Sequence, residues 1–248
     1  HFVDIVLRDV VVEVRGVSLH ATCGNASTSV FWDIVRGSQV ENMKYVVASS
    51  TISVVAFDRM LCIENSVVER FGIDISYSTW NLTVPAKPLT SEVRFATMLT
   101  SRINKFEFSF WSSAMTVVSH RILVTFSVFE STLTRAKILT RRSEWQKYDR
   151  SFGTTLAFTV KRSSVHDVEI RFDDDATIEL TGSNQNLFHF ESSTASNVVV
   201  SIVASWVAVR VVPEKSVVPS IYFMSITNAL YPAVNLTFEI VASRCAVE

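Results

Sequence analysis

Three consecutive carboxylates, Asp173 to Asp175, form a compact group of side chains that could bind a metal or transfer protons. They lie between two stretches of alternating apolar and polar residues, 168–172 and 176–180. Aspartate tolerates the left-handed backbone region and bonds to its own backbone, so three in a row can close a turn between strands. A calcium loop needs the spacing Asp-x-Asp-x-Asp-Gly, which is absent here. We therefore predict a hairpin tip at 173–175 and keep a metal site as the less favoured alternative.

A second reactive group, Ser163, Ser164, His166 and Asp167, lies within five residues. These residue types supply the nucleophile, base and carboxylate of hydrolases, but such partners normally converge from distant parts of a chain. Neighbouring residues of a strand also point to opposite faces. We favour a His166 that faces solvent beside a hairpin, with a catalytic role as the alternative.

Other catalytic signatures are missing. The sequence has no G-x-S-x-G elbow, no H-E-x-x-H pair and no glycine-rich nucleotide loop. We therefore predict a protein that is not an enzyme, with no catalytic residues, no metal and no cofactor.

The region 135–150 concentrates positive charge, with Glu144 and Asp149 as its only acids. The predicted patch consists of Arg135, Lys137, Arg141, Arg142, Trp145, Lys147 and Arg150. Cations interleaved with aromatic rings are what a surface for single-stranded nucleic acid uses. The patch is therefore a candidate for nucleic-acid or subunit contact, although a solvated linker or helix face is the favoured interpretation.

The elements that must position these groups are mostly strands. In "KFEFSFW", Phe106, Phe108 and Phe110 share one face, and "VNLTFEIV" alternates in the same way. Further strands are expected at 3–15, 28–35, 43–58, 73–84, 91–99, 121–130, 154–162, 166–172, 176–182, 197–212 and 219–227. The window 131–150 has partial helical spacing and predicts a short helix or a long loop. No repeat of fixed length is evident.

Length and composition favour one domain. With 248 residues and 48% hydrophobic residues, the chain can bury a large core. We predict an all-β fold, an antiparallel β-sandwich of jelly-roll type with few short helices, covering 1–248. A division into two domains near 140–150 is the alternative.

Charge, cysteines and hydropathy narrow the class of protein. The net charge of −1 excludes a uniformly basic surface. The longest apolar run, 198–209, is shorter than the roughly 18–20 residues of a membrane helix, so no membrane span is expected. Cys23, Cys62 and Cys245 are too few and too far apart for a disulfide framework. The sequons at Asn25, Asn81 and Asn235 match the number expected by chance.

The last fifty residues resemble the closing strands of a picornavirus-like capsid protein. The segments are "NVVVSIVASWVAV", "SIYFMSITNAL" and "VNLTFEIVASRCAVE", with Cys245 and Ala246 as a terminal pair. The resemblance implies an eight-stranded antiparallel sandwich that packs side by side into a shell without catalysis. On this basis we expect a structural coat (capsid) subunit of an icosahedral-type virion, whose partners are other capsid-type subunits.

A second resemblance concerns "VVAFDRM" and "FGIDISYS", which are similar to a stretch of legume lectins. Asp58, Gly72 and Asp74 occupy similar places, while Ala56 and Arg70 stand where that family has metal ligands. The resemblance implies a secreted, lectin-like carbohydrate-binding sandwich with an incomplete metal site. This is the alternative function, and a hydrolase comes third. The candidate exposed aromatic residues are Trp32, Trp80 and Trp111.

Overall fold

The chain folds into strands joined by bends and loops. The computed structural model describes residues 2–22, 29–55, 59–84, 92–119, 122–149, 154–182, 184–211, 220–227, 234–241 and 243–247. These ranges contain 25 strands and no helix. None of the described segments is therefore a helical candidate for crossing a bilayer.

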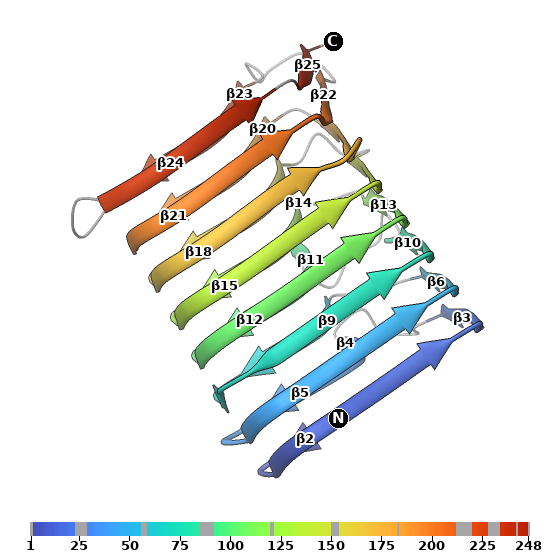
Figure 1. The fold of residues 1–248 in the computed structure, drawn as a ribbon, viewed down its shortest axis with the longest axis vertical. Helices are drawn as coiled ribbons and strands as arrows, with labels where there is room; N and C mark the ends of the chain where they lie inside the picture. Colours follow the sequence, from blue (N-terminus) through green and yellow to red (C-terminus); the bar gives the residue numbers. More distant parts are fainter. Residues whose placement is uncertain are drawn as a thin grey trace.

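The strands form three long sheets (Figure 1). Sheet A contains β1 (Phe2–Val3), β4 (Ser29–Val35), β7 (Arg59–Glu64), β11 (Glu92–Leu99), β14 (Ile122–Phe129), β17 (Thr154–Lys161), β20 (Asn184–Glu191) and β23 (Ser220–Thr227). Sheet B contains β2 (Val6–Arg15), β5 (Gln39–Ala48), β8 (Val67–Val68), β9 (Phe71–Ser76), β12 (Arg102–Trp111), β15 (Thr132–Arg141), β18 (Ser164–Asp173), β21 (Thr194–Val203) and β24 (Val234–Val241). Sheet C contains β3 (Ser18–Thr22), β6 (Thr51–Val55), β10 (Thr79–Thr83), β13 (Ala114–Ser119), β16 (Glu144–Asp149), β19 (Thr177–Gly182), β22 (Trp206–Val211) and β25 (Arg244–Val247).

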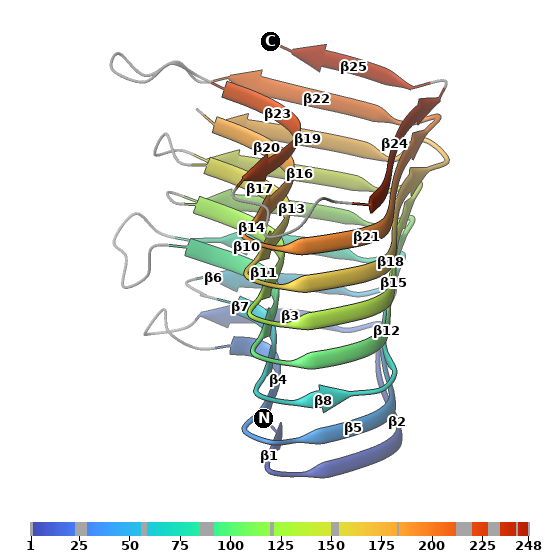
Figure 2. The ribbon, with the colours of Figure 1, turned by 90° about the vertical axis from the view of Figure 1, so that its left-hand side faces the viewer.

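The three sheets wrap around one core as a β-solenoid. Each coil of the chain adds one rung to sheet A, then to sheet B, then to sheet C, and the next coil stacks on top (Figure 2). In the third coil, β8 and β9 together occupy the place of one sheet B strand. Every pair is parallel, as in Phe106 with Ala136 and Phe108 with Ile138.

The predicted antiparallel jelly-roll sandwich is therefore wrong, and with it the association through sandwich surfaces. Alternation shows that a strand has one buried face, and it carries no information on strand direction. Parallel sheets are usually covered on both faces and then read as continuous apolar runs. In sheets B and C one face points to the core and the other to solvent, so the alternation resembles that of antiparallel sheets. Sheet A differs, since four consecutive residues of β7, Met60 to Ile63, are all buried.

The predicted helix or loop at 131–150 is also wrong, because β15 and β16 occupy that window. Arg135 has a φ of 55°, which bends the strand and places both Leu133 and Ala136 in the core. The resulting spacing of three residues imitates a helical pattern. Strands β15 and β16 pair with neighbours on both sides, so the same sheets run through the window where a domain boundary was the alternative.

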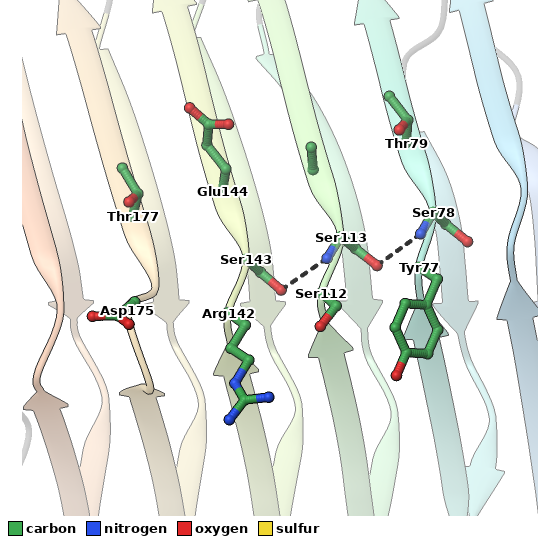
Figure 3. A pocket seen from close by; sticks show the side chains of 11 residues that line it. Tyr77, Ser78, Thr79, Ser112, Ser113, Arg142, Ser143, Glu144, Asp175 and Thr177 are labelled. Atoms are coloured by element: carbon green, nitrogen blue, oxygen red, sulfur yellow. Dashed lines mark hydrogen bonds between the residues drawn. The ribbon is translucent and has the colours of Figure 1, made fainter.

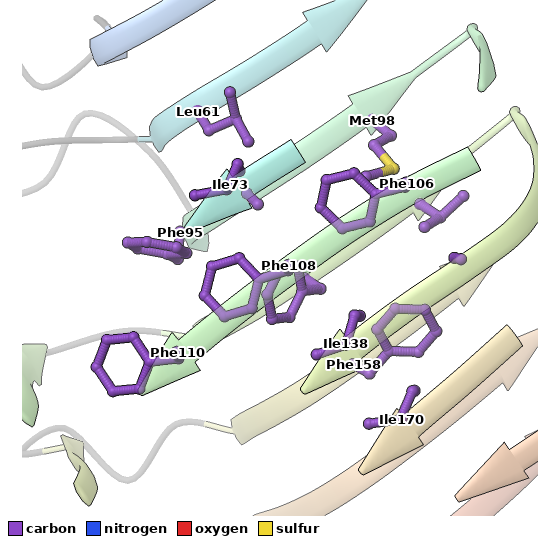
Figure 4. Close-up of a cluster of buried hydrophobic side chains, with 14 of the residues drawn as sticks. Leu61, Ile73, Phe95, Met98, Phe106, Phe108, Phe110, Ile138, Phe158 and Ile170 are labelled. Carbon is purple, nitrogen blue, oxygen red and sulfur yellow. The ribbon is translucent and has the colours of Figure 1, made fainter. Parts of the chain in front are cut away.

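The core contains aromatic side chains stacked from coil to coil (Figure 4). The ring centroids of Phe108 and Phe126 are 4.9 Å apart, and those of Phe71 and Phe106 are 6.1 Å apart in nearly parallel planes. Such pairs add about 0.5–1.5 kcal/mol beyond the burial of apolar area. Trp145 belongs to this cluster, with its ring 6.2 Å from that of Phe108.

Two internal rows of buried serines mark the bends on either side of sheet B. The first row is Ser38, Ser66, Ser101, Ser131, Ser163 and Ser193, and the second is Ser50, Ser78, Ser113, Ser143, Ser205 and the half-buried Ser243. Within a row, the backbone N–H of one serine donates to the hydroxyl of the serine one coil later, as in Ser101 to Ser131 at 3.0 Å. The serines thereby satisfy backbone groups that the bends leave without a ladder partner.

Most bends use non-glycine residues in the left-handed region. Asp9, Asn42, Lys105 and Arg135 are examples in sheet B, whereas the described glycines with positive φ are Gly16 and Gly37. Some of the non-glycine bend residues form side-chain hydrogen bonds to the bend residue of the neighbouring coil. For example, Asn42 Nδ2 donates to Asp9 Oδ1 at 2.7 Å. A glycine at the place of Asn42 would lose that contact.

Candidate functional site

A shallow groove follows the bend between sheets B and C across the third to sixth coils. Its sheet B side is formed by the left-handed bend residues Tyr77, Ser112, Arg142 and Asp175. Its sheet C side is formed by the first outward residues of β10, β13, β16 and β19, namely Thr79, Ala114, Glu144 and Thr177. We call this feature the corner groove, and it has a volume of about 710 Å³.

The groove is hollow because its middle rung is small. Ser112 lies between Tyr77 and Arg142 of the neighbouring coils (Figure 3). Ala114 lies between Thr79 and Glu144 in the register of sheet C. The floor is the second serine row, where Ser78 N donates to Ser113 Oγ at 3.0 Å and Ser113 N donates to Ser143 Oγ at 3.2 Å. The floor is therefore formed by serines that are hydrogen-bonded from coil to coil.

Two exposed aromatic rings stand at one end of the corner groove. Tyr77 and Trp111 are 57% and 40% exposed, and their ring centroids are 5.1 Å apart. Tyr77 stays outside because it is a bend residue, and Trp111 because it is an outward residue at the end of β12. The two adjacent exposed rings are therefore a candidate contact surface.

Three further hollows join the corner groove into a continuous track. A hollow of about 330 Å³ beside Trp111 shares Arg142 with it, and a hollow of about 370 Å³ beside Trp206 shares Asp175. A fourth hollow, of about 230 Å³ around Gly72 on the outer face of sheet B, shares Asp74 with the hollow beside Trp111. The track thus runs along β9 and β12 to the bend and then along the solenoid axis.

The three aspartates lie at a bend between two sheets, which overturns the predicted hairpin tip. Asp174 and Asp175 have φ values of 52° and 63°, so the predicted left-handed backbone is confirmed. In the fifth coil, the two bend serines Ser131 and Ser143 are twelve residues apart. In the sixth coil, the equivalent positions Ser163 and Ala176 are thirteen residues apart, so this corner carries one inserted residue. The insertion gives two left-handed residues in place of one.

The carboxylate of Asp173 is occupied by protein groups. Its Oδ2 lies 3.0 Å from both Nε and the terminal nitrogen of Arg171, and 3.4 Å from a terminal nitrogen of Arg141. Its Oδ1 accepts a bond from the backbone N–H of Asp174 at 3.0 Å. Within the described residues there is no cluster of three metal-ligating side chains.

His166 lies on the outer face of sheet B and contacts two hydroxyls. Its Nε2 is 2.8 Å from Ser164 Oγ, and its Nδ1 is 2.5 Å from Ser196 Oγ. Ser164 also contacts Thr194 Oγ1 at 2.7 Å. Ser163 is turned inward as a member of the first serine row, and Asp167 bonds to Asn197 at 2.8 Å. A hydroxyl thus holds Nδ1 where a catalytic triad has a carboxylate.

The predicted basic patch is divided between the outer face and the core. Lys137 is paired with Glu169 at 3.2 Å, and Arg135 donates to Asn104. Trp145 is 2% exposed, so its ring is unavailable for stacking on a base. Arg141 and Arg142 reach the track, whereas Arg150 and the side chain of Lys147 lie outside the described residues.

Of the aromatic residues expected at a sugar site, Trp111 is exposed and Trp80 is fully buried in β10. The side chain of Trp32 lies outside the described residues, as do Ala56 and Asp58. Tyr77 and Trp206 were missed, since their exposure depends on the bends. Both residues adjoin a serine that recurs at the bends, Ser78 and Ser205, and this adjacency was the sequence signal that could have identified them.

The sequons and cysteines are scattered over the fold. Asn81 is exposed on β10 and Asn235 is exposed on β24, whereas Asn25 lies outside the described residues. Cys62 is a buried cysteine in β7, and its Sγ lies 3.2 Å from a terminal nitrogen of Arg59. Cys23 and the side chain of Cys245 lie outside the described part of the chain.

Two shifted pKa values lie away from the track. Burial raises the pKa of Tyr45, a residue of β5 whose side chain lies in the core. The hydrogen bond from Lys161 holds the pKa of Glu191 below its usual value across β17 and β20.

Comparison with known proteins identifies no relative. No protein-family model, no curated protein and no solved structure matches the chain.

Proposed function

We propose that the protein is a non-catalytic carbohydrate-binding β-solenoid whose ligand lies in the corner groove. The observation that carries the proposal is the exposed Tyr77–Trp111 pair at the end of a groove lined by hydroxyl groups. The lectin-like sandwich of the alternative prediction is replaced by a solenoid, while sugar binding stays a proposal. A secreted or virion location likewise remains a prediction.

The two kinds of lining suit the two kinds of surface on a sugar. The faces of Tyr77 and Trp111 offer apolar area with few rotatable bonds, which binds at a low entropic cost. Thr79, Thr177 and Arg142 present hydroxyl and guanidinium groups for directional bonds to sugar hydroxyls. A hollow with aromatic walls and a few placed polar groups is the usual form of a small-molecule site.

The test is binding of the protein to a panel of immobilised neutral and acidic oligosaccharides, followed by titration of the best ligand. Trp111→Ala and Tyr77→Ala are expected to lower the affinity about tenfold each, as loss of an aromatic contact of roughly 1–1.5 kcal/mol implies. Phe129→Ala is the matched control, since Phe129 lies at a different bend and contacts Arg162. Equal loss in all three variants, or no binding to any oligosaccharide, would contradict the proposal.

A specific observation also favours self-association, as a second candidate function. Phe238 and Ile240 of β24 are 37% and 44% exposed, although they pair with Val200 and Ile202, which are fully buried. We propose that this open core column stacks on β2 of a second copy, which offers Val12 and Val14 in the same columns. Head-to-tail stacking makes filaments. This retains subunit partners from the predicted coat protein but replaces side-by-side sandwich contacts with end-on contacts.

Sedimentation velocity over a range of concentrations tests this second proposal. The wild-type chain is expected to form species that grow with concentration, and Phe238→Lys to remain at 27.8 kDa. Val199→Lys is the control because Val199 is exposed on the outer face of β21. A wild-type monomer at every concentration would exclude the proposal.

A further inference from the structure

An axial row of like charges crosses the outer face of sheet B at its bend. Arg70, Lys105 and Arg135 occupy equivalent positions on the third, fourth and fifth coils, as the flanking pairs of β8, β9, β12 and β15 show. Adjacent strands are about 4.8 Å apart, so these cations are close neighbours. Like charges directly opposite one another destabilise a sheet, and a bound anion would relieve that repulsion.

The row borders a notch created by Gly72. The outward position of Gly72 lies between Lys44 and Glu107 in the register, so a missing side chain leaves a gap there. This is the hollow of about 230 Å³, whose lining includes Lys44, Arg70 and Lys105. Gly72 has no positive φ, and an added Cβ would meet Lys44 Cγ at 3.5 Å, an ordinary contact. The backbone therefore does not require glycine here.

The cations of the notch differ in how they are paired. Lys105 lies 3.3 Å from Glu107, and Lys44 lies 3.6 Å from Asp74. Arg70 is exposed, and no side chain of the described residues pairs with its guanidinium. Its carbonyl oxygen accepts a hydrogen bond from Met43 N at 2.9 Å. A guanidinium in this position can bind a carboxylate or sulfate through two parallel hydrogen bonds.

The notch adjoins the hollow beside Trp111, with which it shares Asp74 and Ser109, and that hollow adjoins the corner groove, with which it shares Arg142. The five steps from one residue to the next between Gly72 and Tyr77 span about 16 Å along the strand. One ligand must therefore be an extended chain to occupy both places.

We infer that the Gly72 notch is a second subsite, which binds an anionic group of an acidic polysaccharide whose chain also occupies the corner groove. The inference rests on the proposed carbohydrate-binding function and adds the class of ligand. A single-stranded nucleic acid is less favoured because Trp145, the tryptophan interleaved with the basic residues of 135–150, is 2% exposed and cannot stack on a base.

The test measures the affinity of the intact chain for four probes: polygalacturonate, chondroitin sulfate, dextran and a polythymidine oligonucleotide. One or both acidic polysaccharides are expected to bind at least tenfold more tightly than dextran. Tighter binding of chondroitin sulfate than of polygalacturonate would indicate that sulfate contributes, since both polymers carry carboxylates. Arg70→Gln and Gly72→Leu are each expected to lower the affinity for the acidic polysaccharide about tenfold, which is the contribution of one charge-assisted contact. Binding of a short neutral oligosaccharide to the corner groove stays unchanged in both variants.

Lys137→Gln is the matched control, because Lys137 is an outward cation on the same sheet that is paired with Glu169 outside the notch. Equal binding of dextran and acidic polymers, with Trp111-dependent binding intact, would overturn the second subsite and leave the proposed function standing. Tighter binding of the oligonucleotide than of either polysaccharide would also overturn it. Absence of binding to all probes and short oligosaccharides would overturn both proposals.

Discussion

Single residues in the left-handed backbone region make the bends of the solenoid. For most side chains this region costs about 1–2 kcal/mol, and asparagine and aspartate tolerate it best. At several bends the side chain contributes something in return, such as the bond from Asn197 Nδ2 to Asp167 Oδ1 at 2.8 Å. Thr100 is an exposed, β-branched bend residue with a φ of 49°, which is a poorly suited residue type.

Thr100→Gly is expected to raise the free energy of unfolding by roughly 1 kcal/mol, because relief of the strain exceeds the entropic cost of glycine. The backbone bond from residue 100 N to Phe129 O, at 3.0 Å, is retained. Chemical denaturation at neutral pH measures the change. Thr132→Gly, at a strand position without positive φ, should lower stability instead. A loss of stability at residue 100 as large as at residue 132 would contradict the strain argument.

At the scale of elements, the serine rows hold neighbouring coils in register. Ser101 is 5% exposed, and its hydroxyl accepts from Ser66 N at 3.2 Å and donates to Leu99 O at 2.8 Å. Each hydroxyl thus links its own strand end to the coil before it. The second serine row is interrupted at Ala176, the bend that carries the extra aspartate.

Ser101→Ala is expected to lower the free energy of unfolding by about 1–3 kcal/mol, because the buried N–H of Ser66 loses its acceptor. Thermal or denaturant unfolding followed by circular dichroism measures this loss. Ser18→Ala, at an exposed position of β3, should change stability by less than about 0.5 kcal/mol. Equal effects in the two variants would mean that the row adds no stability.

At the scale of the molecule, stability depends on position along the axis, since each coil contacts only its neighbours. Phe108 lies mid-axis with rings on several sides, including those of Phe95, Phe126 and Trp145. Phe238 points to the same core from the last coil but is 37% exposed.

Phe108→Ala is expected to cost about 3–5 kcal/mol, the range for truncating a buried phenylalanine. Phe238→Ala should cost markedly less, since much of its surface already contacts solvent. Denaturant midpoints of the two variants, measured at the same dilute concentration, give the comparison. A similar cost at both positions would show that the last coil is covered in solution.

Much of the strand content could be predicted from local patterns. The expected strands at 121–130, 154–162 and 176–182 are confirmed as β14, β17 and β19. The single strand expected at 43–58 is two strands, β5 and β6. The bend between them was missed because it contains Ser50 and neither a glycine nor a proline. The site could be predicted only in part: Trp111 was named as an exposed aromatic residue, but Tyr77 and the Gly72 notch depend on which coils are neighbours.

By itself, the sequence determined which residues form strands and which faces are buried, because alternation arises from the geometry of a single strand. Only the tertiary structure decided that the strands are parallel, since each one bonds to partners about one coil away, as Ser101 does to Ser131. It also decided that the carboxylates at 173–175 form a corner between sheets instead of a hairpin tip. That choice depends on whether the chain turns back on itself or continues around the core, and a turn sequence of three aspartates permits both.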